Sequence, residues 1–380
     1  MAPVIKYDQL VFSPANVDLS FSPMRKSLKE PTYVLGAFNP GLCRLPNGNL
    51  LIMVRVAEAL SHPVSNNNIH SIRWDAAEGY VADAWPMAGV TMNDPRKFSI
   101  NYYGNAVIAL TSLSWLLPVQ LSEDGSTVKQ IHYDKIIAPQ FTSQEYGIED
   151  PRISLIEGRY YMTTCCVSSE RHSTMLYVSD DGLNYTSVGI VLDHQNKDML
   201  LFEGKINNSF HALTRPLGEC YFASPPSSIY HPGAAIHLAS SPDLLHWKPA
   251  DKAFLRAHKS SLSNVKIGGG TPPVLTADGW LMLYHGVENK TAIGIYRTFW
   301  AMLDKDDPSK IVHLADTTPL LEANSTITAA ISQQVYLNEV VFTTGIAAHG
   351  ADFILASGEL DLACRITIIS KEYFSDSLHK

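Results

Sequence analysis

The chain has 380 residues, of which 46% are hydrophobic and 17% are charged, and its formal net charge is −8 at pH 7. This much apolar sequence can build a large core, which excludes global disorder. The acidic balance argues against binding to nucleic acids or anionic membranes, because both partners need clustered Lys and Arg. No stretch approaches the roughly 18 apolar residues of a membrane span, and the first residues do not resemble a signal peptide.

The cysteines indicate a reducing compartment. Their number is odd and their positions are scattered, at Cys43, Cys165, Cys166, Cys220 and Cys364. Disulfide-bonded secreted domains carry paired cysteines, so we expect reduced thiols and a cytoplasmic protein. The spacings typical of zinc sites do not occur in the sequence. We therefore expect neither a metal nor a cofactor.

The predicted elements are almost all β-strands. Short runs rich in Val, Ile, Leu, Tyr and Thr alternate with clusters of Gly, Pro, Asn and Asp, as expected for an all-β protein. In chain order, the clearest runs lie at 50–56, 106–110, 160–167, 234–239, 280–284 and 292–298. Long segments of helical period are scarce.

A turn motif recurs after several of these strands. The stretches LSEDGSTV, VSDDGLNY and SSPDLLHW place Asp124, Asp181 and Asp243 about 60 residues apart, which suits one four-stranded propeller blade with generous loops. The chain length then predicts a single five-bladed β-propeller over residues 1–380, with residues 1–30 as an N-terminal extension that packs on the propeller or closes it. A pair of β-sandwiches with coincidental turns is the alternative.

In a propeller, strand ends and loops from every blade meet near the central axis, so a site draws residues from distant segments. Polar residues next to the predicted strands are therefore the candidates. They are Asn39, Arg55, Arg96, Asn105, Asp150, Arg152, Glu170, Arg171, Glu203, Lys205, Arg215, His231, His285 and Asp361. Taken alone, each could also belong to a structural ion pair or a polar turn.

The stretch Glu149-Asp150-Pro151-Arg152 is the most concentrated of these candidates. Proline fixes its own φ and biases the preceding residue away from the helical region, so the backbone aims the carboxylate of Asp150. Arg152 can pair with either acid. A salt-bridged turn and a rigidly held catalytic carboxylate both fit this local sequence.

The candidate set of carboxylates, cations and amides suits a carbohydrate, because glycosidic bonds are cleaved by pairs of carboxyl groups. No Gly-x-Ser-x-Gly motif supports a serine hydrolase. The glycines 268–270 are not a phosphate-binding P-loop, since they lack the Gly-Lys-Ser/Thr ending and precede no helix.

The motifs GIEDPRI, SSPDLLHW and KIGGGTPPVLTADGWLMLYHGV, together with the stretch around Asp361, resemble glycoside hydrolase family 130 from about Phe38 to Ile366. The resemblance implies a five-bladed propeller that acts on β-mannosides, either as an inverting phosphorylase or as an inverting hydrolase. It implies that Asp150 is the general acid, which in the phosphorylases acts through a hydroxyl of the bound mannose.

The resemblance also implies which residues hold the mannose, namely Asn39, Arg55, Asn105 (or Asn101) and Asp361. The stretch RVAEAL departs from the Arg-x-Glu-Asp pattern of many relatives, so the sugar contacts there can differ.

The two reactions need opposite charges on the attacking side. Phosphate needs cations, and Arg171, His172, Lys205, Arg215 and His231 are available. Water needs a carboxylate base.

Two acids are candidates for this base. Glu203 stands in LLFEGKI, where many phosphorylases resemble Phe-Pro-Glu-Lys-Ile, and Glu170 can assist it. We therefore expect an inverting β-1,2-mannosidase with Asp150 as acid and Glu203 and Glu170 activating water.

Two alternatives remain. One is an inverting β-mannoside phosphorylase that forms mannose 1-phosphate, with phosphate held by Arg171, Lys205, Arg215 and His231. The other is a non-catalytic mannoside-binding propeller. In each case the partner is a β-mannoside oligosaccharide, and the sequence leaves a homo-oligomer open.

Overall fold

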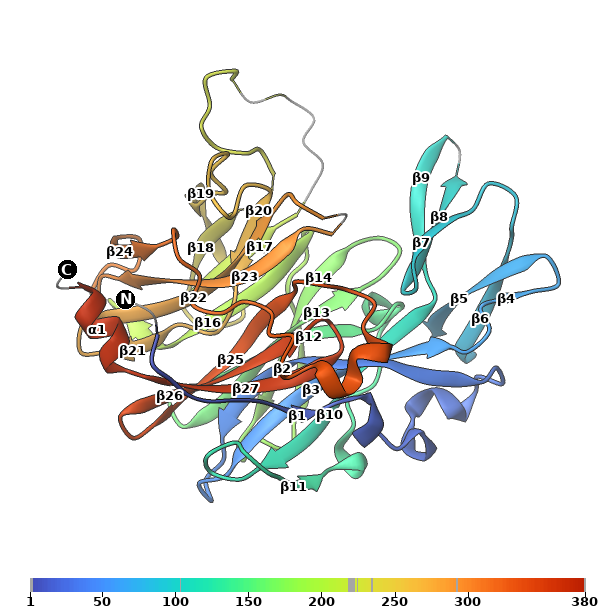
Figure 1. Ribbon diagram of the computed structural model, residues 1–380, viewed down its shortest axis with the longest axis horizontal. Coiled ribbons are helices and arrows are strands. Elements are labelled where there is room, and N and C mark those ends of the chain that lie inside the picture. Colours follow the sequence, from blue (N-terminus) through green and yellow to red (C-terminus); the bar gives the residue numbers. More distant parts are fainter. Residues whose placement is uncertain are drawn as a thin grey trace.

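The structure is a computed structural model that describes residues 3–102, 104–217, 223, 225–233, 235–291 and 293–378. Nearly all regular structure in these ranges is β-strand, which confirms the predicted all-β class (Figure 1). The described α-helix is α1 (Glu372–Leu378). Short 3-10 helices are η1 (Pro14–Asn16), η2 (Leu19–Phe21), η3 (Pro23–Lys26), η4 (Tyr133–Lys135), η5 (Thr142–Gln144) and η6 (Ala329–Gln334). None of the helices described has the length and apolar character needed to cross a bilayer.

Five antiparallel sheets of four or five strands follow one another along the chain. In each sheet, the strand that comes first in the sequence lies at an edge. Sheet one contains β2 (Thr32–Arg44), β3 (Leu50–Leu60), β10 (Ser112–Leu121) and β11 (Val128–Ile131). Sheet two contains β12 (Ile148–Ile156), β13 (Arg159–Val167), β14 (His172–Ser179) and β15 (Thr186–Leu192). Sheet three contains β16 (Asn196–Ile206), β17 (Ser209–Pro216), β18 (Ile236–Ser241) and β19 (Lys248–Leu255).

Sheet five, unlike sheet four, combines strands from both ends of the chain. Sheet four contains β20 (Lys266–Gly269), β21 (Val274–Thr276), β22 (Gly279–Glu288), β23 (Ile295–Leu303) and β24 (Ile311–Ala315). Sheet five contains β25 (Val341–His349), β26 (Asp352–Glu359), β27 (Ala363–Ser370) and the N-terminal strand β1 (Ile5–Phe12). β1 therefore pairs with a strand from the opposite end of the sequence. Arg365 on β27 donates hydrogen bonds of 2.6 and 2.8 Å to the two carboxylate oxygens of Asp8 on β1.

An insertion interrupts sheet one between β3 and β10. Its two three-stranded sheets project at the right of Figure 1. The first contains β4 (Val64–Ser65), β5 (Asn68–Asp75) and β6 (Gly79–Pro86), and the second contains β7 (Thr91–Asp94), β8 (Lys97–Tyr102) and β9 (Asn105–Leu110). We call residues 61–111 the insertion.

The predicted strands correspond to β3, β9, β13, β18, β22 and β23, although residues 234 and 292, which begin two of the predicted runs, lie outside the described residues, as does Cys220. The recurring turn motif occupies the same place in three sheets. Asp124, Asp181 and Asp243 each lie in the turn between the third and fourth strands of a sheet. Each accepts a hydrogen bond from a serine two residues earlier, which repeats the same local turn in three sheets.

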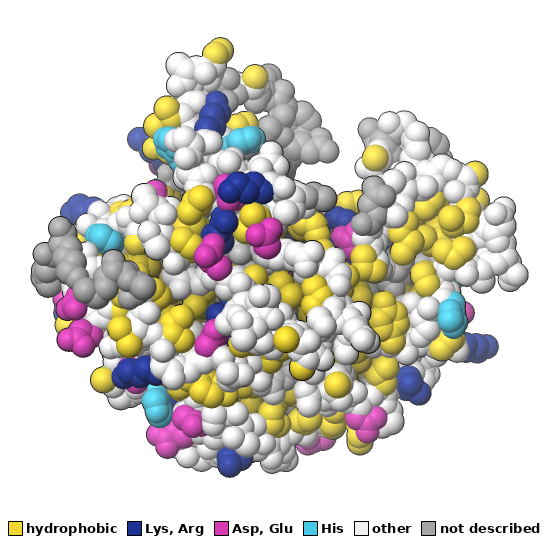
Figure 2. Space-filling view, in the orientation of Figure 1, with side chains coloured by type: hydrophobic (Ala, Val, Ile, Leu, Met, Phe, Trp, Pro, Cys, Tyr) yellow, Lys and Arg dark blue, Asp and Glu magenta, His cyan; other side chains and the backbone are white. Residues whose placement is uncertain are grey.

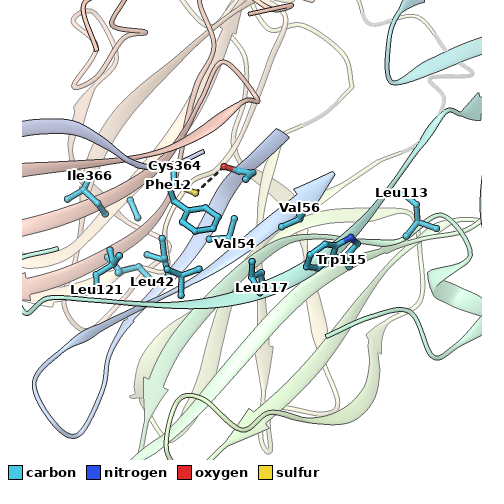
Figure 3. Packing of buried hydrophobic residues seen from close by; sticks show 14 of the residues in the cluster. Phe12, Leu42, Val54, Val56, Leu113, Trp115, Leu117, Leu121, Cys364 and Ile366 are labelled. Atoms are coloured by element: carbon cyan, nitrogen blue, oxygen red, sulfur yellow. Dashed lines mark hydrogen bonds between the residues drawn. The ribbon is translucent and has the colours of Figure 1, made fainter. Parts of the chain in front are cut away.

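The hydrophobic core is divided among the spaces between consecutive sheets. Separate clusters of buried side chains join sheets one and two, two and three, three and four, and four and five. A further cluster joins sheets five and one, where Ile366 on β27 packs near Leu42 and Val54 (Figure 3). Because both faces of a sheet such as sheet one are covered, β3 is an almost continuous apolar run instead of an alternating one. An arginine inside that run therefore needs a partner.

Candidate active site

The first strands of sheets one, two and three contain the same local irregularity. The ladder register shifts in β2 near Asn39, in β12 near Asp150 and in β16 near Asp198. Each of these residues has a left-handed backbone, with φ of 46°, 50° and 53°, which Asn and Asp adopt more readily than other non-glycine residues. Bulges of this kind re-aim side chains. Since β12 contacts both β2 and β16, the three bulges bring polar groups together.

Asp150 is at the centre of this group. Its Oδ1 accepts hydrogen bonds from Asn39 Nδ2 and from Arg55 Nη1, both at 2.9 Å. Arg55 Nη2 also binds Glu149 at 2.8 Å, and Lys197 Nζ binds the other oxygen of Glu149 at 2.8 Å. The arginine inside β3 therefore has its partners. Among the described residues, no hydrogen bond is donated to Asp150 Oδ2, so this oxygen is free to exchange a proton.

The charges around Asp150 set its protonation. Burial alone would raise the pKa of its carboxyl, but Arg55, Arg152 and Lys197 lower it well below its usual range. Burial acts on Glu149 in the same way, and Arg55 and Lys197 again lower the pKa. Both acids are therefore ionised at neutral pH in the protein alone. A general acid here must gain its proton when ligands change the local charge.

Arg152 binds the backbone of Asp150. Its guanidinium is almost fully buried and donates to the backbone oxygens of Gly270 and Asp150 at 2.6 and 2.9 Å. It therefore fixes the strained backbone of Asp150 to sheet four. Sequence reasoning placed Arg152 among the substrate-binding residues, and its burial instead points to a positioning role.

A group of cations lies beyond Asp150, toward sheets three and four. Arg215 on β17 binds Asp198 Oδ2 at 2.5 Å. Lys266 at the start of β20 lies 4.9 Å from the ring centre of Tyr296, and burial followed by the charge of Arg215 lowers its pKa to about 8. His285 on β22 stacks on Tyr296, and burial lowers its pKa to about 3, so its imidazole is neutral.

The glycines of this region allow the group to pack closely. A Cβ on Gly268 would lie 2.6 Å from Asp198 Oδ2 and 2.7 Å from Arg215 Cδ, and would also collide with the ring of His285. Only glycine leaves room for these three side chains to meet. Gly268 therefore serves the close packing of protein side chains.

The opposite side of Asp150 is formed by Asp361 and the insertion. Asp361 follows β26, has φ of 51°, and its Oδ2 accepts a hydrogen bond from Arg96 at 2.7 Å. Burial raises the pKa of Asp361, while Arg96 and Arg55 lower it. The insertion thus reaches the same site that sheets one, two and five form.

Two predicted residues lie away from the site. Glu203 and Lys205 are exposed near the C-terminal end of β16. Lys197, which binds Glu149, is at the other end of the strand, about 20 Å away at the usual rise of a strand. Lys205 pairs with Glu157 at 3.3 Å. Within the described residues no hydrogen bond or ion pair joins Glu203 to the group around Asp150, so the structure does not support Glu203 as the base, although burial raises the pKa of its carboxyl to about 7.

Glu170, Arg171 and His231 also face solvent. Glu170 pairs with Arg171 at 3.8 Å, and its side chain is 81% exposed. In the part of the chain that the structure describes, the ring of His231 has one hydrogen-bond partner, the backbone oxygen of Pro232 at 3.1 Å. None of these three is hydrogen-bonded to the cluster around Asp150. Asn105 begins β9, but its side chain lies outside the described part of the chain.

The structure brings together eight predicted residues and adds others. Those predicted are Asn39, Arg55, Arg96, Asp150, Arg152, Arg215, His285 and Asp361. Those that sequence reasoning missed are Asp94, Lys197, Asp198, Lys266, Tyr296 and Tyr336. A signal for Asp198 existed: it precedes an apolar run at the start of a first strand, as Asp150 does in β12.

Figure 2 shows a hollow between the insertion and the projection that carries β18 and β19. Lys, Arg, Asp and Glu side chains are visible beside this hollow. Within the described ranges, no group of three or more His, Cys, Asp or Glu residues is arranged to hold a metal ion.

The family model and the relatives that match this sequence are described as phosphorylases. A family model described as beta-1,4-mannooligosaccharide phosphorylase matches residues 88–378. The beta-1,2-mannobiose phosphorylase of Listeria innocua is 30% identical, over 88% of this chain and 89% of its own. A 1,2-beta-oligomannan phosphorylase of a Thermoanaerobacter species is 29% identical over 66% of this chain and 76% of its own.

One similar solved structure is also a phosphorylase. The Listeria innocua phosphorylase in complex with beta-1,2-mannobiose superposes with a TM-score of 0.79 at 25% identity, covering 98% of this chain and 99% of that one. These relatives overturn the predicted hydrolase, because the named relatives are phosphorylases. The misplaced Glu203 gives the physical reason: the residue expected to activate water is not at the site.

Proposed function

Because the chain belongs to glycoside hydrolase family 130, we propose that it is an inverting β-1,2-mannoside phosphorylase. It transfers the mannosyl group of β-1,2-mannobiose, or of a longer β-1,2-mannan, to inorganic phosphate. The products are mannose 1-phosphate and a sugar shortened by one residue. The observation that carries this proposal is the group of cations, Arg215, Lys266 and Lys197, next to a carboxyl whose second oxygen is free.

Phosphate and sugar occupy opposite sides of Asp150 in this proposal. The mannosyl group lies against Asn39, Arg55 and Asp361, which carry donors and acceptors for hydroxyls. Phosphate lies against Arg215 and the neighbouring cations, because a multiply charged anion needs several of them. The position of β12 between β2 and β16 supports this division.

Each group then has one role in the reaction. A phosphate oxygen forms a bond to the anomeric carbon while the bond from that carbon to the leaving oxygen breaks, so the configuration inverts. Asp150 gives its proton to the leaving oxygen, directly or through a hydroxyl of the mannosyl group. The reaction takes up no net proton, because hydrogen phosphate loses the proton that the released sugar gains.

Phosphate also prepares the acid. Without it, Arg55, Arg152 and Lys197 outweigh burial and hold the pKa of Asp150 low. A bound phosphate dianion offsets this positive charge and raises that pKa, which favours the protonated form that the reaction needs. Phosphate is therefore both the nucleophile and the ligand that lets Asp150 act.

We propose a single five-bladed propeller for the architecture, over residues 1–380, with the N-terminal segment completing the last blade. The five core clusters between consecutive sheets support this arrangement, including the cluster between sheets five and one. The pairing of β1 with β27 supports the role of the N-terminal segment.

The test is incubation of the purified protein with β-1,2-mannobiose, with and without inorganic phosphate. We expect mannose and mannose 1-phosphate in equal amounts, only when phosphate is present, and no product from Asp150→Asn. β-1,4-Mannobiose is the matched second substrate. Free mannose formed without phosphate would overturn the proposal.

A further inference from the structure

The turn between β7 and β8 is the part of the insertion that reaches the site. This turn contains Pro95 and Arg96. Thr111, directly before β10, holds it from both sides: its backbone N–H donates to the oxygen of Arg96 at 3.0 Å, and its Oγ1 donates to the oxygen of Pro95 at 2.5 Å. The turn is thereby fastened to the base of sheet one.

Arg96 is held by an acid of its own turn. Its backbone N–H and Nε donate to Asp94 Oδ1, both at 2.9 Å, and its Nη2 donates to Oδ2 at 2.7 Å. The remaining nitrogen, Nη1, donates to Asp361 Oδ2 at 2.7 Å. The guanidinium carbon lies 5.9 Å from the ring centre of Tyr336. This side chain therefore has one orientation, and it points at Asp361.

Asp361 is fixed on one side and free on the other. Its backbone oxygen accepts a hydrogen bond from Tyr336 at 3.0 Å, and its Oδ2 is bound by Arg96. Among the described residues, none donates a hydrogen bond to its Oδ1. The charged groups nearest its carboxyl are Arg96, Arg55, Asp150 and Glu149. Its charge also acts on three further titratable groups, which are Lys266, Tyr296 and Tyr336. An ionised carboxylate with one oxygen held and the other free is a directed acceptor for sugar hydroxyls.

We propose that Arg96 is a positioning residue for the sugar pocket: it holds Oδ2 of Asp361 so that Oδ1 accepts hydroxyls of the bound sugar. The insertion is then part of the active site and not a peripheral decoration. Mannose as the sugar rests on the proposed function. The geometry of Arg96 and Asp361 stands without it.

The charge of Arg96 has a second effect. Asp361 lies beside two other acids, Asp150 and Glu149, and burial already raises its pKa. Loss of the Arg96 guanidinium removes a charge that lowers this pKa, so Asp361 takes up a proton at higher pH. A protonated Asp361 accepts hydroxyls poorly, and sugar affinity is then lost at the acidic end of the pH range earlier than in the wild type.

A matched control lies in the same insertion. Arg73 on β5 binds Asp83 at 2.7 Å and Asp75 at 3.1 Å, with a similarly exposed side chain, and it makes no contact with Asp361. Arg73→Met removes the same chemistry from the same insertion. Any effect of the insertion on overall folding appears in this variant as well.

The experiment compares Arg96→Met, Arg96→Lys and Arg73→Met by initial rates in both substrates, over pH 5 to 9. We expect Arg96→Met to raise KM for β-1,2-mannobiose at least about tenfold, to leave KM for phosphate within about twofold, and to move the acidic limb of kcat/KM to higher pH. Arg96→Lys should recover part of this loss, and Arg73→Met should match the wild type.

Unchanged KM for mannobiose and an unchanged acidic limb in Arg96→Met would overturn the proposal, and so would an equal loss in Arg73→Met. Should Arg96→Met not fold, the Lys variant decides, since wild-type affinity there would contradict the required geometry. A wild type that forms no mannose 1-phosphate instead contradicts the proposed function. Calorimetry with mannose and mannobiose then tests Arg96 alone.

Discussion

Replacing Gly268 with alanine should weaken phosphate binding selectively. The added Cβ would lie 2.6 Å from Asp198 Oδ2 and 2.7 Å from Arg215 Cδ, and it would collide with the ring of His285. The backbone of Gly268 does not lie in the left-handed region, so alanine adds no strain in φ. The whole effect comes from displacing the groups that we assign to the anion.

The magnitude follows from the cost of overpacking. One extra methyl group in a closely packed site costs about 1–3 kcal/mol, and about 1.4 kcal/mol corresponds to a tenfold change in an equilibrium constant. If phosphate binding bears this cost, KM for phosphate rises about 5- to 150-fold. The assay is the initial rate of mannose 1-phosphate formation at saturating mannobiose over a range of phosphate concentrations.

Gly269→Ala is the control. A Cβ there would collide with the side chain of Leu200, which belongs to the core between sheets three and four. We expect this variant to lower thermal stability with little change in KM for phosphate. The reasoning is refuted if Gly268→Ala leaves KM for phosphate unchanged, or if both variants raise it equally.

Three further predictions follow from other sites. Glu203→Gln should keep phosphorolysis within about twofold of wild type, since no described hydrogen bond or ion pair joins Glu203 to the group around Asp150; a large loss of kcat would contradict its placement. KM for phosphate should increase as the pH is raised above about 8, because the pKa of Lys266 is lowered to about 8 and the side chain then loses its positive charge. The same increase in a Lys266→Met variant would exclude this assignment. Arg365→Met leaves Asp8 and Glu359 unpaired and should reduce the free energy of unfolding by about 3–5 kcal/mol in urea titrations; wild-type stability would show that β1 is anchored otherwise.

Local sequence was sufficient for features that depend on neighbouring residues. The strands β3, β13 and β22 follow from their apolar runs, and the turn at Asp181 follows from its own serine and acid. Asp150 was identifiable because proline constrains it. Such features need no knowledge of what lies across the sheet.

The misassigned residues depend on which end of a strand faces the site. Glu203 and Asp198 both lie on β16, and a motif comparison without strand register favoured the wrong one. Lys266 and Tyr296 come together only because β20 and β23 flank β22 in the same sheet. Side chains that meet across strands cannot be paired from their own sequence neighbourhood.

The pairing of β1 with β27 has a consequence for the order of folding. Residues 5–12 are synthesised about 350 residues before their partners at 364–369. At about 5–20 residues per second, the first strand waits roughly 20 to 70 seconds on the ribosome with one edge unsatisfied. Asp361, in the turn that leads into β27, emerges just before that strand, so the nascent chain acquires its sugar pocket only as β1 and β27 join.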